Sequence, residues 1–168
     1  LDGDGNLAWE TSYGEAGAEI GYAVAVDAEG AIVVAGTVAP AGSSDTDGLI
    51  AKFDSEGQKL WAKTFGSPED KDGAKTLTLA HADQGYVLAG YRGNAGQDGT
   101  MRDLYAARYG NDGALKWAET LGGLDYDEAL SLTKSNLGGY AIAGYTISGS
   151  LGAKDLWLLH LDGSGNLM

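Results

Sequence analysis

The chain has 168 residues, of which 28 are glycine and two are proline, and it has no cysteine. Its 24 acidic and 11 basic side chains give a formal net charge of −13, which repels polyanions and argues against a nucleic-acid partner. Without cysteine there are no disulfides, thiolate metal sites or cysteine nucleophiles, and no apolar run is long enough for a membrane span. The many glycines, which follow no three-residue period, predict tight turns between short strands.

A short strand bounded by glycines recurs three times along the chain. The copies end at Gly36, Gly90 and Gly144, spaced 54 residues apart. A tryptophan also recurs once per copy, at Trp9, Trp61 and Trp117. Similarity at a fixed period predicts one repeat domain over residues 1–168. Its units cover about 5–56, 57–112 and 113–164, and a fourth unit opens at 165–168.

Each unit is predicted to contain four short strands. The first carries the tryptophan and covers 6–13, 58–65 and 114–121. The second covers 21–26, 74–80 and 129–133, and the third lies within 28–37, 83–91 and 136–146. The fourth covers 49–53, 104–109 and 156–161. Apolar and small residues alternate in these segments, as expected for strands with one buried face, and short turns between them predict antiparallel neighbours.

This arrangement favours an all-β fold built from β-propeller blades. Four antiparallel strands in a unit of about 52 to 56 residues match one blade. A β-trefoil is the alternative, because it also contains three units of four strands. The variable segments lie between the third and fourth strands and between the first and second, where function is most often grafted onto a repeat.

The third unit carries the fullest set of motifs. They read Trp117-x-x-Thr120-x-Gly122-Gly123, then Gly138-Gly139-Tyr140-x-x-Ala143-Gly144-Tyr145-Thr146, then Asp155-x-Trp157. The pattern resembles the glycine-rich β-propeller repeats of bacterial and archaeal secreted and cell-surface proteins, over the whole chain. The first unit departs from it, with Ala31 where the other two have tyrosine. The resemblance implies a propeller and an extracellular or cell-surface location, but no particular ligand or reaction.

The two ends of the chain carry the same element. Residues 1–7 and 161–167 both read Leu-Asp-Gly-x-Gly-Asn-Leu, so we expect two complementary strand edges. Three units are fewer than the about four to eight blades of a closed propeller. We therefore expect either a longer parent chain or copies joined head to tail, as a dimeric ring or an open fibre, rather than a closed monomer. The residues expected at the joining ends are Asn6, Leu7, Trp9, Leu156, Leu158 and Leu161.

Acidic residues offer one candidate for metal binding and one for catalysis. Asp2, Asp4 and Asn6 alternate as in a calcium loop, but Leu7 stands where such a loop has glycine. The equivalent turns keep no such ligand series, so no metal or other cofactor is predicted. Carboxylates of the loop at 125–128, such as Asp125 or Asp127, could serve glycoside hydrolysis. Because Asp127, Asp72 and Glu19 fall at equivalent repeat positions, a structural role is favoured.

The two histidines do not indicate catalysis. His81 and His160 have no nucleophile nearby in sequence, and His160 takes the place of Lys52 and Arg108 on the fourth strand, where we expect an outward polar side chain. We therefore predict that the protein is not an enzyme.

Two tyrosines could carry a ligand site. Tyr91 and Tyr145 precede the variable loops, where exposed rings could stack on sugars, although packing between units is the favoured explanation. The accompanying polar candidates are Asn94, Asp98, Ser148 and Ser150. The sequence thus predicts a non-enzymatic structural or protein-interaction module of an exported or cell-surface protein that assembles head to tail. The alternative is a carbohydrate-binding, lectin-like propeller module.

Overall fold

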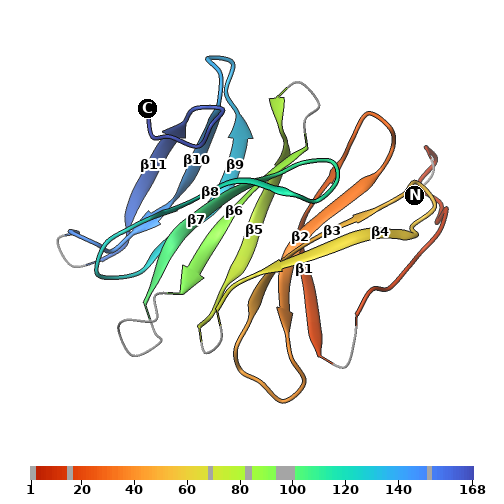
Figure 1. The fold of residues 1–168 in the computed structure, drawn as a ribbon, viewed down its shortest axis with the longest axis horizontal. Coiled ribbons are helices and arrows are strands. Elements are labelled where there is room, and N and C mark those ends of the chain that lie inside the picture. The colour runs from red at the N-terminus through yellow and green to blue at the C-terminus, as the bar shows by residue number, and fades with distance from the viewer. Residues whose placement is uncertain (1–2, 15–16, 68–69, 82–84, 94–100, 151–152) are drawn as a thin grey trace.

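The computed structural model describes residues 3–14, 17–67, 70–81, 85–93, 101–150 and 153–168 (Figure 1). These residues form three antiparallel sheets without an α-helix. Sheet 1 contains β1 (Ala18–Val26), β2 (Ile32–Ala39), β3 (Asp47–Phe53) and β4 (Lys59–Phe65). Sheet 2 contains β5 (Gly73–Leu79), β6 (Tyr86–Gly93), β7 (Arg102–Tyr109) and β8 (Leu115–Leu121). Sheet 3 contains β9 (Asp127–Lys134), β10 (Tyr140–Thr146) and β11 (Asp155–Leu161).

Each sheet is a meander in which neighbouring strands follow one another in the chain. The tryptophan strand pairs with the strand before it: Trp61 lies opposite Lys52, and Trp117 lies opposite Arg108. The strand predicted at 6–13 is different, because this segment is described but pairs with no other strand. A strand requires a neighbour for its backbone hydrogen bonds, and the described residues place no strand beside the backbone of this segment.

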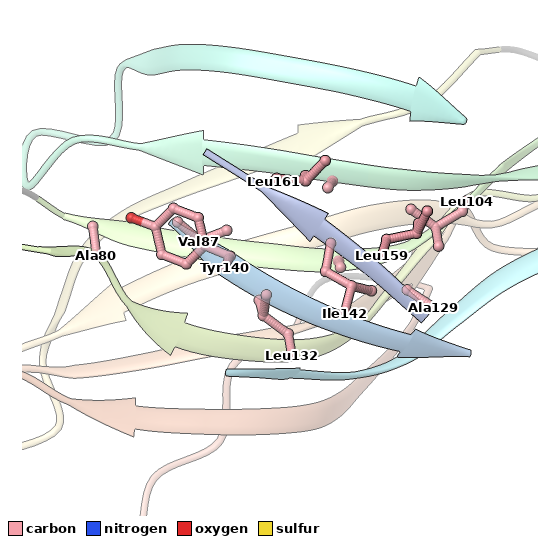
Figure 2. Close-up of a cluster of buried hydrophobic side chains, with 11 residues drawn as sticks. Ala80, Val87, Leu104, Ala129, Leu132, Tyr140, Ile142, Leu159 and Leu161 are labelled. Atoms are coloured by element: carbon pink, nitrogen blue, oxygen red, sulfur yellow. The ribbon is translucent and has the colours of Figure 1, made fainter. Parts of the chain in front are cut away.

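The three sheets stand in a row, with sheet 2 between the other two and the two chain ends at opposite ends of the row (Figure 1). Alternation of side chains gives sheet 2 two buried faces. Tyr86 and Leu88 belong to the core shared with sheet 1, whereas Val87 and Ala89 belong to the core shared with sheet 3. Figure 2 shows this second core, where side chains of sheet 3 such as Tyr140 meet those of sheet 2.

The recurring glycine at the end of the third predicted strand has a steric cause. A Cβ on Gly36, Gly90 or Gly144 would lie within 2.0 Å of a backbone oxygen on or next to the first strand of the same sheet. The strand register is irregular at the same place in all three sheets. Only glycine permits this approach, so the repeat motif is a backbone device.

The strand pairing corrects one equivalence drawn from the sequence. Tyr86 and Tyr140 pair with Tyr109 and Leu161, and the residue of sheet 1 in the same register is Ile32, opposite Phe53. Ile32, and not Ala31, therefore replaces the tyrosine of the other sheets. The described residues form no closed ring of sheets (Figure 1). They also contain no helix long and apolar enough to cross a bilayer.

Candidate interaction surfaces

A tryptophan fastens each unit to the following turn. The indole Nε1 atoms of Trp9, Trp61 and Trp117 donate to the carbonyl oxygens of Ser55, Asn111 and Gly163 at 3.0–3.1 Å. The rings lie over Gly57, Gly113 and Gly165, which have positive φ, and a Cβ there would come within 3.0 Å of the indole. The sheets are thus joined by one contact that repeats, and Trp9 makes it without belonging to a strand.

A buried tyrosine hydroxyl also links each pair of neighbouring sheets. Tyr86 donates to Asp27 Oδ2 at 2.8 Å, and Lys52 Nζ lies 3.0 Å from the same oxygen. Burial alone would raise the pKa of Asp27, but the hydrogen bonds from Tyr86 and Lys52 lower it. Lys52 is therefore buried and forms an ion pair with Asp27, which corrects the expectation that the side chain at this position points outward.

His81 follows β5 and His160 lies on β11, and both side chains contact backbone oxygens. At the junction of sheets 2 and 3, the His81 backbone N–H donates to the Tyr140 hydroxyl at 3.3 Å, and His81 Nε2 lies 2.9 Å from the Gly139 oxygen. His160 Nε2 lies 3.1 Å from the Gly138 oxygen. These contacts give both imidazoles a structural explanation.

The carboxylate of Asp127 accepts hydrogen bonds from two loops. Asp127 is buried, and its Oδ2 accepts hydrogen bonds from the Gly123 N–H at 2.9 Å and the Ser148 hydroxyl at 2.8 Å. The Asp125 N–H in turn donates to the Ser148 oxygen at 3.1 Å. The structure therefore brings together Asp125, Asp127 and Ser148, which were separate candidates in the sequence. Their hydrogen bonds connect the loop before β9 to the loop after β10.

Asp72 makes equivalent hydrogen bonds near the junction of sheets 1 and 2. Its carboxylate accepts from the N–H groups of Ser67 and Gly93, both at 3.1 Å. Burial raises the pKa of Asp72 to about 6, and the nearby charge of Asp47 acts in the same direction. The described part of the chain contains no group of three or more side chains suited to a metal ion. Asp4 and Asn6 are exposed, and Asp2 lies outside the described residues.

Tyr91 and Tyr145 gather around an arginine that the sequence patterns did not indicate. The guanidinium of Arg102 lies 4.4 Å from the Tyr91 ring centre, and its Nη2 lies 3.0 Å from Glu128 Oε2. The Tyr145 hydroxyl donates to the same Glu128 oxygen at 2.9 Å. Tyr91 is buried, and Lys154 Nζ lies 3.7 Å from the centre of the Tyr145 ring. Cations thus occupy ring faces that a sugar would need.

Ser150 is the remaining polar candidate that the structure describes. Ser150 donates its backbone N–H to the Ile147 oxygen at 3.0 Å, as part of a turn. Asn94 and Asp98 lie outside the described residues.

The outer face of sheet 3 exposes apolar side chains that are buried elsewhere in the fold. Ile50, Ala106 and Leu158 pair with Ala35, Ala89 and Ala143, so they are equivalent. Ile50 and Ala106 are 0% exposed, whereas Leu158 is 68% exposed. Leu156 is 82% exposed. Leu161, also expected at this end, is buried in the core and bridges to Leu167.

The outer face of sheet 1 has an apolar cavity of about 360 Å³. Its floor comes from β2 and β3, including Ile32, Val34 and Leu49, and its wall comes from Trp9 and other residues of the segment 6–13. No sequence pattern indicated this cavity. It is lined by Ile32 and Leu49 where sheet 2 has the larger Tyr86 and Tyr105. Asn6 and Leu7 are exposed beside it.

Comparison with protein-family models and with curated proteins finds no match to this chain.

Proposed function

We propose that this chain is a non-enzymatic structural module of an exported or cell-surface protein. In this proposal its sheets are β-propeller blades, and it joins to further sheets of the same kind head to tail. The two joining surfaces are the outer face of sheet 3 and the outer face of sheet 1. They lie at opposite ends of the row of sheets in Figure 1, so joining them extends the row.

The observation that carries the proposal is the exposure of Leu158. At the equivalent position Ile50 and Ala106 are fully buried against the next sheet, and Leu158 is 68% exposed. Burying a leucine side chain is worth about 1.5–3 kcal/mol, and an exposed apolar face of this kind marks an interaction surface. Leu156, two residues away on the same strand, enlarges the same apolar surface and is 82% exposed.

The polar candidates support a structural role over a catalytic one. The carboxylates of Asp72 and Asp127 accept hydrogen bonds from loop backbone, and His81 and His160 contact backbone oxygens. Groups held in this way keep neighbouring sheets and loops together. The net charge of −13 disfavours nucleic acid as the partner.

Substitution of Leu158 tests the proposal. The wild-type chain is expected to associate at micromolar and higher concentrations in light scattering after gel filtration. Leu158→Lys should make it monomeric, because the charge would have to be buried. The matched control is Leu137→Lys, since Leu137 is also highly exposed but lies in a turn. Equal mass for the wild type and both variants would contradict the proposal.

A further inference from the structure

A strand-like segment lies on sheet 1 without a strand neighbour of its own. In the segment 6–13, the side chains of Trp9, Thr11 and Tyr13 line the cavity, at alternate positions as in an extended strand. Trp9 is fixed by its bond to the Ser55 oxygen, and the ring of Tyr13 packs edge-on against Phe53 with centroids 6.0 Å apart. Within the described residues the segment forms no strand pairing, so it is held in place with its backbone edge open.

The junction of sheets 1 and 2 shows what such a cavity accommodates. There Ile50 of sheet 1 packs in one buried cluster with side chains of sheet 2, namely Tyr86, Leu88, Tyr105 and Ala107. Strand pairing makes these four equivalent to residues of sheet 1 that line the cavity, namely Ile32, Val34, Leu49 and Ala51. The counterpart of Ile50 on sheet 3 is Leu158. The cavity on sheet 1 is therefore equivalent to the surface of sheet 2 that buries Ile50, and Leu158 is the side chain equivalent to Ile50.

We infer that the occupant of the cavity is Leu158 of a second copy of this chain, and that the segment 6–13 pairs with the outer edge of that copy's β11. The inference rests on the proposed function and specifies its partner and its register. Among the described residues sheet 3 has three strands and the other sheets have four, so the second copy completes sheet 3 by donating a fourth strand.

The register of this pairing follows from the two junctions within the chain. Trp61 lies opposite Lys52, and Trp117 lies opposite Arg108, so Trp9 should lie opposite His160 of the other copy. Two residues further along, Thr11 lies opposite Leu158 on the same face of the pair. Ser12 points to the opposite face. We expect the pairing between copies to begin at Trp9. The His160 backbone oxygen already accepts a hydrogen bond from the Met168 N–H of its own chain at 2.9 Å, so the pairing cannot extend further in that direction.

Cysteine cross-linking tests the register, and the chain has no cysteine of its own. A Thr11→Cys chain is mixed with a Leu158→Cys chain under mild oxidation, and covalent heterodimer is measured by mass spectrometry. Directly opposed residues have Cβ atoms about 4.5–5.5 Å apart, close to what a disulfide spans. The matched control mixes Ser12→Cys with Leu158→Cys. We expect at least about fivefold more heterodimer from the first mixture, since only that pair shares a face.

The outcomes separate this inference from the proposal beneath it. An associated chain that cross-links equally in both mixtures, or in neither, would overturn the strand register and leave the proposed function standing. A wild-type chain that stays monomeric would overturn both. As a second measurement, Val34→Phe fills the cavity from its floor, and it should weaken association at least about tenfold while leaving the melting temperature of the monomer within a few degrees. Unchanged association would count against Leu158 entering the cavity.

Discussion

The indole of Trp61 donates to the backbone oxygen of Asn111 across 3.0 Å, from the outermost strand of sheet 1 to the last turn of sheet 2. The bond joins two sheets that share no strand. Trp61→Phe keeps an aromatic ring but removes the donor, so we expect a loss of about 1–2 kcal/mol in unfolding free energy. Urea unfolding measures it. Trp9→Phe should cost less, because Trp9 lies on a segment without strand pairing; a larger loss there would contradict this account.

Gly113 is required beneath that tryptophan. Its φ is 76°, and a Cβ would come 3.0 Å from Trp61 Cδ2. Gly113→Ala should therefore destabilise the fold by about 1–3 kcal/mol in the same assay. Gly163→Ala is the control, because no atom lies within 4 Å of a Cβ at that turn position. If the two variants unfold alike, the indole does not depend on the glycine.

Sequence reasoning located the strands of the three sheets well because the repeat carries its own constraints. Gly36, Gly90 and Gly144 are required by close backbone approach, and their spacing aligned the remaining elements. It failed for 6–13, where a strand-like sequence has no neighbour to pair with. It also expected Lys52 at the surface, because a sequence does not show that Asp27 of the neighbouring strand pair lies 3.0 Å away.

The candidate sites were less predictable than the strands. The cluster around Arg102 depends on residues from four strands and a loop of different units, and no spacing in the sequence indicates that they meet. The cavity depends on a difference in side-chain size between equivalent residues, Ile32 against Tyr86. That comparison needs the strand register. The sequence pattern had aligned Ala31 with the tyrosines, one residue before the correct Ile32.

Stability should depend on pH through Asp72. Burial raises its pKa to about 6 from the ordinary value of 3.8, so the folded state binds the proton more tightly than the unfolded chain. Protonation of Asp72 therefore contributes to the free energy of unfolding. The contribution is complete below about pH 4, is lost as the pH rises through about 6, and has an upper limit near 3 kcal/mol. Asp72→Asn should flatten the melting profile in that window. Parallel profiles for the wild type and the variant would assign the dependence to other groups.

The ion pair between Arg102 and Glu128 holds sheets 2 and 3 together at the loop end. Glu128→Gln leaves the guanidinium, which is partly exposed, without its carboxylate at 3.0 Å. We expect a loss of about 1–3 kcal/mol, below that of a fully buried pair. Glu56→Gln in the exposed turn after β3 is the control and should change stability by less than about 0.5 kcal/mol. Equal effects would mean that Arg102 contributes only through its aromatic contacts.

The central claim is that the open faces of sheets 1 and 3 join one copy of the chain to another. Sedimentation equilibrium of the wild-type protein over a rising concentration series tests it most directly. The average mass should climb from 17.3 kDa toward whole multiples of it, with no such rise for Leu158→Lys. A wild-type mass that remains at 17.3 kDa across the series would contradict the claim.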